Sequence, residues 1–326
     1  MAGVLDQQIT DRWAIYNANA MEVLPELPAE SFHASIYSPP FAGLYHYSSD
    51  DRDLSNAGDY TEFETMYGFF IDEITRLTIP GRTTAVHAAP VQLANTGKDS
   101  LIDFPGDVIR WHQQRGWHWI AEHCIWKEPL AVRNRTMVKN LAHKTIVDDA
   151  AFAGVASADR LLIFRKAGPS VEPIDHPCGL TGDYAGDEQP PAELRRYRGW
   201  DGDQKSNRYS HWIWRRYASS VWDDVRIDRV LPFREARDED DEKHVHPLQL
   251  DVIDRYLDLR TKPGERVLTP FMGVGSEVHE AVRMGRYGFG VELKPSYYRQ
   301  AVRNMASIDQ ERSEDVALFD LAGGEG

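Results

Sequence analysis

Short apolar runs, rich in β-branched and aromatic residues, alternate along the chain with longer stretches of helical periodicity. The short runs predict strands at 13–16, 32–37, 83–88, 117–126, 161–164, 267–268 and 287–291. The longer stretches predict helices at 60–77, ended by Pro80-Gly81, and at 104–115, 247–259 and 277–284. Strands that alternate with helices indicate an α/β fold, with a mostly parallel sheet covered on both faces.

The periodicity fails between Gly168 and Trp222, where Gly, Pro, Arg and aromatic residues predominate. This stretch predicts an irregular insertion rather than a part of the sheet. Arginines interleaved with aromatic residues suit contacts to phosphates and stacking on bases, although a solvated basic face around a small aromatic core would have the same composition.

Composition narrows the class of protein. The 326 residues carry a net charge of −14, which argues against a surface covered in basic patches but leaves local nucleic-acid sites open. Only two cysteines occur and HExxH spacing is absent, so we expect a reducing, cytoplasmic setting and no metal site. We see neither a secretory signal nor an apolar run of membrane-spanning length, so we expect no membrane partner.

The first motif with chemical meaning is Ser38-Pro39-Pro40-Phe41, directly after the apolar run 32–37. Two prolines fix φ and remove two N–H donors, which predicts a stiff turn whose carbonyls are free to accept. A flat ring bearing an amino group could stack on Phe41 and donate to the Ser38 hydroxyl and the Pro39 carbonyl. Taken alone, the motif is more often a simple loop.

A second motif, Thr269-Pro-Phe-Met-Gly-Val-Gly-Ser276, lies between a predicted strand and a predicted helix, and the next strand ends at Glu292. Glycines allow a ligand to approach the backbone closely, and a carboxylate at the following strand end can bind two ribose hydroxyls. The combination favours a cofactor that contains a nucleoside; a glycine turn needed only for packing is the alternative.

Together the two motifs resemble those of amino-group DNA methyltransferases of the β arrangement, in which the catalytic motif precedes the S-adenosylmethionine motif. The resemblance covers roughly 13–305. A closer likeness is to prophage-type adenine-N6 methyltransferases of relaxed sequence specificity, through the strings SPPFAGLYHYSSDDRDLSN, HCIWKEP, NLAHKT, TPFMGVGSEV and GVELKPSYY. It implies a Rossmann-like, mostly parallel seven-stranded sheet with circularly permuted motif order, and a phage or restriction–modification setting.

The resemblance also implies three parts: a catalytic half at 1–167, an inserted DNA target-recognition region at 168–230 and a cofactor-binding half at 231–326. The motif 38–41 would hold a flipped base, as reaching an amino group inside a duplex requires. The residues implied for S-adenosylmethionine are Asn19, His246, Thr269, Phe271, Gly273, Gly275, Ser276 and Glu292. Thr269 stands where the family usually has an aspartate, so one cofactor contact is expected to be missing or rerouted.

Duplex DNA is the expected partner, bound by a monomer or homodimer. The residues expected to contact DNA are Arg133, Arg135, Lys139, Lys144, Arg195, Arg196, Arg198, Lys205, Arg208, Arg215 and Arg216. Adenine N6 is the expected target, by direct methyl transfer without a covalent enzyme intermediate. Ser38 is a weaker acceptor than the aspartate of many adenine enzymes, so cytosine N4 stays open, as do an RNA or protein methyltransferase and a binder without activity.

Overall fold

The computed structural model describes residues 3–40, 53–92, 101–136, 139–170, 172–177, 179–180, 208–236 and 247–322. The chain forms two compact units. Unit 1 comprises Met1–Ile79, Ile227–Asp254 and Pro263–Gly326, and unit 2 comprises Pro80–Arg226 and Arg255–Lys262. The functional division into three parts remains a prediction.

The strands of unit 1 lie in the order β1 (Asp6–Ile9), β2 (Trp13–Asn17), β11 (Tyr287–Glu292), β10 (Arg266–Thr269) and β3 (Phe32–Tyr37). β2, β11, β10 and β3 pair in parallel, and only the exposed β1 is antiparallel to its neighbour. The expected strands 13–16, 32–37, 267–268 and 287–291 are therefore confirmed. Because parallel strands share one carboxyl edge, the segments that follow them meet there.

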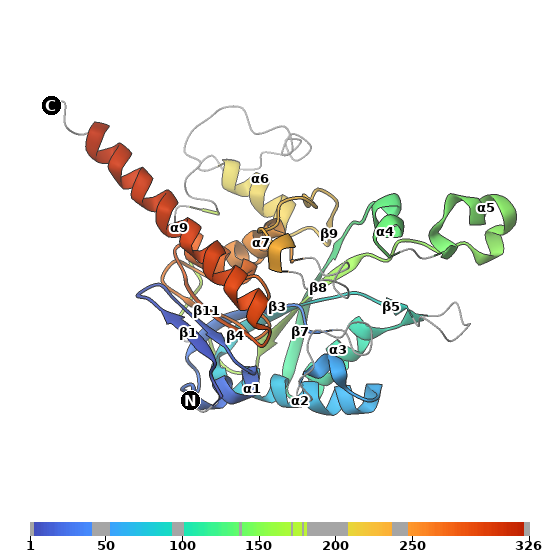
Figure 1. Ribbon diagram of the computed structural model, residues 1–326, viewed down its shortest axis with the longest axis horizontal. Coiled ribbons are helices and arrows are strands. Elements are labelled where there is room, and N and C mark those ends of the chain that lie inside the picture. The colour runs from blue at the N-terminus through green and yellow to red at the C-terminus, as the bar shows by residue number, and fades with distance from the viewer. Residues whose placement is uncertain are drawn as a thin grey trace. The chain divides into compact units, whose positions relative to one another are not determined.

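Helices bury the apolar residues of these strands. Unit 1 contains η2 (Leu54–Asn56), η6 (Arg234–Ala236), α1 (Ala20–Val23), η1 (Leu24–Glu26), α2 (Tyr60–Leu77), α8 (Ser276–Arg283), α9 (Pro295–Ala322) and the first half of α7 (Leu250–Arg260). One core cluster joins β2, α8 and α9 through residues that include Ile15, Val278 and Met305. Figure 1 shows α9, in red, extending well past the strands of this unit.

Unit 2 is organised around β8 (Asp159–Lys166), which pairs antiparallel with both β4 (Thr78–Ala88) and β7 (Trp117–Ile125). The short β9 (Val221–Trp222) lies beyond β7 and is parallel to it. Among the described residues the main sheet has nine strands rather than the seven that the family resemblance implies, and the short β1 and β9 are among them. The other elements are β5 (Val91–Gln92), β6 (Leu101–Ile102), α3 (Phe104–Gln114), α4 (Pro129–Thr136), η3 (Lys139–Leu141), α5 (His143–Asp149), η4 (Ala150–Phe152) and α6 (Arg208–Tyr217).

Two local expectations were wrong. Pro80-Gly81 does not end α2: the helix ends at Leu77, Thr78 caps it by donating its hydroxyl to the carbonyl of Ile74 at 2.7 Å, and the chain continues directly as β4. The stretch 168–222 also contains regular structure, namely α6 and β9. Its helix buries Trp212, Ile213 and Tyr217, an apolar face that the surrounding charges obscure in the sequence.

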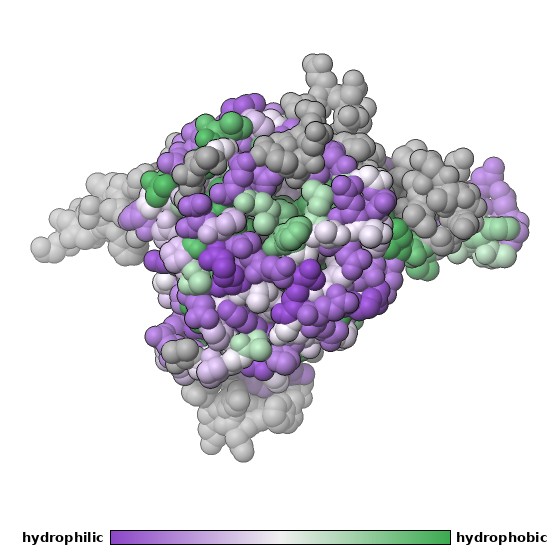
Figure 2. Space-filling view, turned by 90° about the horizontal axis from the view of Figure 1, so that it is seen from below, coloured by the Kyte–Doolittle hydropathy of each residue, from purple (hydrophilic) through white to green (hydrophobic). Residues whose placement is uncertain are grey.

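The face of the molecule seen in Figure 2 is mainly hydrophilic among the described residues, and its apolar side chains gather only in small areas. In the described part of the chain, no helix is long and apolar enough to cross a membrane. Among the described residues, large apolar side chains such as Tyr37, Phe63 and Trp222 are almost completely buried.

A network of charges joins α7 to α8 within unit 1. Arg229 pairs with Asp251 at 2.8 Å and with Asp254 at 2.5 Å, and lies 3.4 Å from Glu280, whose side chain is fully buried. Removing one member of such a network leaves buried carboxylates without their partner. We therefore expect Arg229→Ala to lower the free energy of unfolding by about 3 kcal/mol, measured by chemical denaturation.

The matched control is Arg110→Ala. Arg110 forms an exposed ion pair with Asp107, one helical turn away. Exposed pairs contribute little, so this change is expected to cost less than about 1 kcal/mol. Equal losses in the two variants would show that the network around Arg229 adds nothing beyond a surface pair.

Candidate functional site

Both sequence motifs follow neighbouring parallel strands of unit 1. In β10, Leu268 pairs with Ser35 of β3, and Thr269 pairs with Gly290 of β11. The Ser38-Pro39-Pro40 turn, the glycine turn 270–275 and Glu292 therefore come together at one carboxyl edge. Ligands of open α/β sheets bind at this kind of edge.

Aromatic contacts connect the two motifs directly. Tyr37, the residue before Ser38, has its ring 5.7 Å from that of Phe271. Phe271 in turn lies 4.8 Å from the ring of Phe70 on α2, and the Tyr37 hydroxyl lies 3.3 Å from that of Tyr67. Phe271 is thus anchored among aromatic rings and fixes the glycine turn beside the Ser38 turn.

The glycine turn has the geometry of a close-approach loop. Gly273 and Gly275 have φ values of +54° and +91°, in a region of backbone conformation that residues other than glycine rarely adopt. A Cβ at Gly273 would meet nothing within 4 Å, whereas one at Gly275 would lie 3.1 Å from the Cβ of Ala301. Gly275 is therefore needed for packing against α9, and Gly273 borders open space that a ligand can occupy.

Glu292 is tied to this turn by its own carboxyl oxygens. The backbone N–H groups of Gly273 and Lys294 donate to them, each at 2.8 Å. Burial raises the pKa of Glu292 to about 7, and the nearby carboxylate of Asp53 adds to the rise, while the two N–H donors oppose it. The site therefore holds a carboxyl group that titrates near neutral pH.

Asn17 and Asp53 are site residues that sequence reasoning missed. The Asn17 side chain donates to the carbonyls of Glu292, at 2.8 Å, and Leu293, at 3.0 Å, and so holds the end of β11 against β2. In the sequence, only the position of Asn17 at the end of a predicted strand could have indicated this role. Asp53 is buried, and its charge helps to raise the pKa of Glu292. It lies in a loop, and the hydrophobic pattern of the sequence does not predict where a loop lies.

The remaining expected cofactor residues of unit 1 fall into two kinds. The Asn19 side chain caps α1 by accepting from the Met21 N–H at 2.9 Å, so it has a structural role of its own. Thr269 and Ser276 are buried, and their hydroxyl oxygens have no hydrogen-bond partner among the described residues. Buried hydroxyls without partners are costly unless a ligand or water completes them.

Several expected site residues lie outside the described residues, and the structure places none of them: Phe41, His246, Arg195, Arg196, Arg198 and Lys205. The side chains of Arg135, Lys139 and Arg208 are likewise outside the described part. Their roles remain predictions.

The described basic residues of the expected DNA surface all belong to unit 2. Arg216 donates to Asp224 at 2.6 Å, and Asp224 also pairs with the buried Arg255 at 2.8 Å, so Arg216 stabilises the fold around α6. Lys144 is exposed on α5, 3.9 Å from Asp148. Arg133 lies on α4 with its guanidinium 3.4 Å from the side chain of Asn134.

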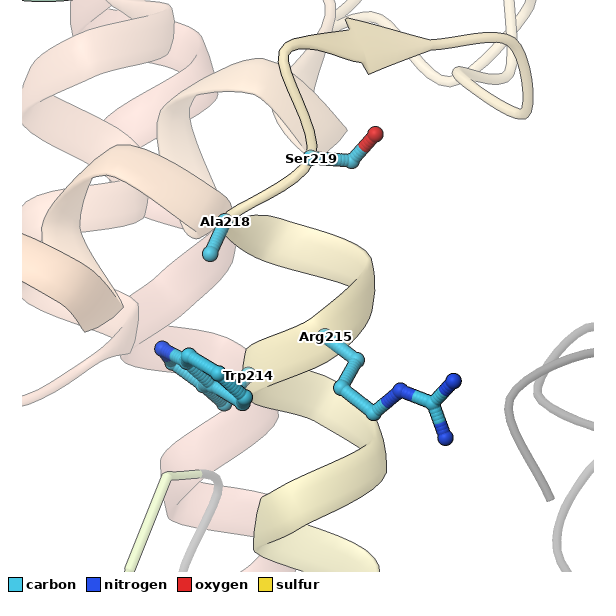
Figure 3. A pocket seen from close by; sticks show the side chains of 4 residues that line it. All are labelled: Trp214, Arg215, Ala218 and Ser219. Atoms are coloured by element: carbon cyan, nitrogen blue, oxygen red, sulfur yellow. The ribbon is translucent and has the colours of Figure 1, made fainter. Parts of the chain in front are cut away.

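An open hollow of about 420 Å³ lies at the end of α6, lined by Trp214, Arg215, Ala218 and Ser219. Figure 3 shows Trp214 and Arg215 projecting from the helix in different directions. Trp214 is 51% exposed, and its ring lies 5.5 Å from that of the buried His211. An exposed indole suits stacking on a base, and a guanidinium suits contact with a phosphate.

A charged cluster occupies the ends of three strands of unit 2. Asp159 accepts from Lys127 at 2.5 Å and lies 2.9 Å from His87 Nε2. Burial alone would raise the pKa of Asp159, but His87 and Lys127 hold it well below its usual range. Lys127 is therefore committed to an ion pair. Among the described residues, no group of His, Cys, Asp and Glu is arranged to hold a metal ion.

The chain is similar in sequence to known proteins. M.BglII, a type II methyltransferase of Bacillus subtilis, is 36% identical in an alignment of 296 positions that covers 87% of this chain and 66% of that protein. The chain thus spans slightly less than two thirds of that relative's length.

Two solved structures share the fold. TTHA0409 of Thermus thermophilus, in complex with S-adenosyl-L-methionine, is 20% identical, with a TM-score of 0.54 over 88% of this chain and 93% of that one. PvuII DNA methyltransferase (cytosine-N4-specific) is 13% identical, with a TM-score of 0.56 over 93% and 90%. These likenesses confirm the expected α/β, Rossmann-like methyltransferase fold. The DNA methylase family N6_N4_Mtase matches residues 32–303, and the chain belongs to this family.

Proposed function

We propose that this protein transfers a methyl group from S-adenosylmethionine to an exocyclic amino nitrogen of a base in DNA. The contact between Tyr37 and Phe271 is the observation that carries the proposal, because it joins the amino-group turn to the glycine turn. Membership of the DNA methylase family supports the same reaction.

The residues of the glycine edge fit the proposed cofactor. Gly273 borders open space, Glu292 can accept from ribose hydroxyls, and the buried hydroxyls of Thr269 and Ser276 have no partner among the described residues. When bound, S-adenosylmethionine supplies an electrophilic methyl group. TTHA0409, which has this fold, was solved with that cofactor.

The Ser38 turn would position the accepting nitrogen. The Ser38 hydroxyl and the Pro39 carbonyl accept from the amino group, which directs its lone pair towards the methyl group. Phe41, which follows Pro40, stacks on the flipped base and offsets the cost of removing it from the duplex. Catalysis would rest on positioning and hydrogen bonding, without a nucleophilic side chain.

Adenine N6 is the target that we propose, with the relaxed sequence specificity that the resemblance to prophage-type methyltransferases implies. Cytosine N4 is the second candidate, supported by Ser38 in place of a stronger acceptor and by the cytosine-N4-specific PvuII enzyme of the same fold. The test is transfer of a labelled methyl group to unmethylated duplex DNA, followed by analysis of the product nucleosides.

Each outcome of that test has a clear meaning. N6-methyladenine in many sequence contexts would support the proposal. N4-methylcytosine would keep the reaction and replace the base. Cofactor binding without transfer to DNA would contradict the proposal, and an RNA duplex of equal length, at the same salt concentration, then tests RNA as the substrate.

The hollow on α6 provides a DNA contact that can be tested separately. We expect Trp214→Ala to weaken binding of duplex DNA about tenfold, because stacking of one base on an aromatic ring contributes about 1–3 kcal/mol. The measurement is fluorescence anisotropy with labelled DNA. Trp119 on β7 is 43% exposed, and Trp119→Ala is the matched control, expected to leave DNA affinity unchanged. Equal DNA affinity of the two variants would show that Trp214 on α6 does not contact DNA.

A further inference from the structure

A second buried carboxyl group borders the glycine turn. Glu277 is the second residue of α8, which begins directly after Gly275, and it is only 5% exposed. Its carboxyl accepts a hydrogen bond from its own backbone N–H and is close enough to Glu292 to feel its charge. No cationic side chain among the described residues pairs with Glu277.

Burying a carboxylate without a cation costs free energy when no ligand is bound. A buried carboxylate needs a cation or several donors, or it takes up a proton. Burial raises the pKa of Glu277 to about 8, and the charge of Glu292 contributes to the rise. Glu277 is therefore mostly neutral at pH 7 until a positive group arrives beside it.

Two buried hydroxyl groups near Glu277 also have no hydrogen-bond partner among the described residues. Thr269 and Ser276, at the two ends of the glycine turn, are 1% and 2% exposed, and their hydroxyls have no partner among the described residues. In the described part of the chain, two buried hydroxyls at the ends of the turn thus lack a hydrogen-bond partner, and the buried carboxyl of Glu277 beside them lacks a cation. Together they indicate a polar, positively charged ligand group at this turn.

The cofactor of the proposed function offers two positive groups. Its sulfonium has no hydrogen to donate, whereas its ammonium has three donors, the number that a lysine ammonium offers to carboxylates. Both carboxyl oxygens of Glu292 already accept from backbone N–H groups and suit neutral hydroxyls. Glu277 has no such donors beyond its own N–H.

We propose that Glu277 is a further cofactor-binding residue, whose carboxylate receives the ammonium of the methionine part of S-adenosylmethionine. This inference rests on the proposed function of the glycine turn. It would supply a negative charge close to the position where Thr269 replaces the acid that the family resemblance leads one to expect.

The test is calorimetric titration of Glu277→Gln with three ligands. S-Adenosylmethionine and S-adenosylhomocysteine both carry the ammonium, and 5′-methylthioadenosine lacks the whole amino-acid part. Gln has the shape of the neutral acid, so the variant is expected to fold. We expect about ten- to hundredfold weaker binding of the first two ligands and unchanged binding of the third. Glu26→Gln, an exposed change in the same unit, is the control.

The other outcomes contradict the inference in distinguishable ways. Equal weakening for all three ligands would make Glu277 a structural residue of the turn. Weakening for S-adenosylmethionine alone would place its carboxylate at the sulfonium. Unchanged binding of all three would remove it from the site. If the wild-type protein binds none of the ligands, the proposed function itself fails.

Discussion

Gly273→Asp is expected to abolish cofactor binding while the protein stays folded. Gly273 has a φ of +54°, and its N–H donates to the Glu292 carboxyl at 2.8 Å. An aspartate would fill the open space that the ligand needs and would place a second negative charge beside Glu292. We expect affinity for S-adenosylmethionine to fall at least about a hundredfold, which is about 2.7 kcal/mol, as measured by calorimetry.

Gly264→Asp separates the effect on the site from the effect on the backbone. Gly264 also has a positive φ, of +84°, and a Cβ there would also meet nothing within 4 Å. It lies in the turn before β10, away from the carboxyl edge, with its N–H donating to the carbonyl of Gly285 at 2.8 Å. This control should bind the cofactor normally. Equal losses in both variants would mean that Gly273 matters only for folding.

Phe41→Ala, in contrast to Gly273→Asp, is expected to impair methyl transfer and to leave cofactor binding intact. Loss of the stacking ring should leave affinity for S-adenosylmethionine within about twofold, while kcat/KM for DNA falls about a hundredfold, because a flipped base without its platform returns to the duplex. The measurement combines calorimetry with steady-state methyl transfer.

Phe69→Ala is the matched control for this prediction, because Phe69 is 56% exposed on α2 of unit 1. It should change neither quantity. If Phe41→Ala binds the cofactor poorly, the Ser38 turn does not serve the base alone, and the two turns do not have separate roles. If it transfers methyl groups at the normal rate, the Ser38 turn is not the base site.

The sequence predicted those parts of the fold in which local pattern and packing agree. The strand at 32–37 and the helix at 60–77 have the bounds of β3 and α2 because each has an apolar period and a clear polar boundary. The two motifs were recognisable for the same reason, since prolines and glycines constrain the backbone locally.

Features that depend on partners distant in the sequence were not predicted. Asn17 acts through carbonyls at positions 292 and 293, and Glu277 is unusual only because it is buried without a cation. The antiparallel pairing of β8 likewise depends on its neighbours rather than on its own composition. The helix α6 was hidden because a net basic and aromatic composition masks its apolar face.

A crystal structure with bound S-adenosylhomocysteine is the most direct measurement of whether the two turns form one site. The account predicts ribose hydroxyls within hydrogen-bond distance of the Glu292 carboxyl, the amino-acid part along the glycine turn 270–275, and the sulfur directed towards Ser38. A cofactor bound elsewhere, or bound here with its sulfur directed away from the Ser38 turn, would contradict it.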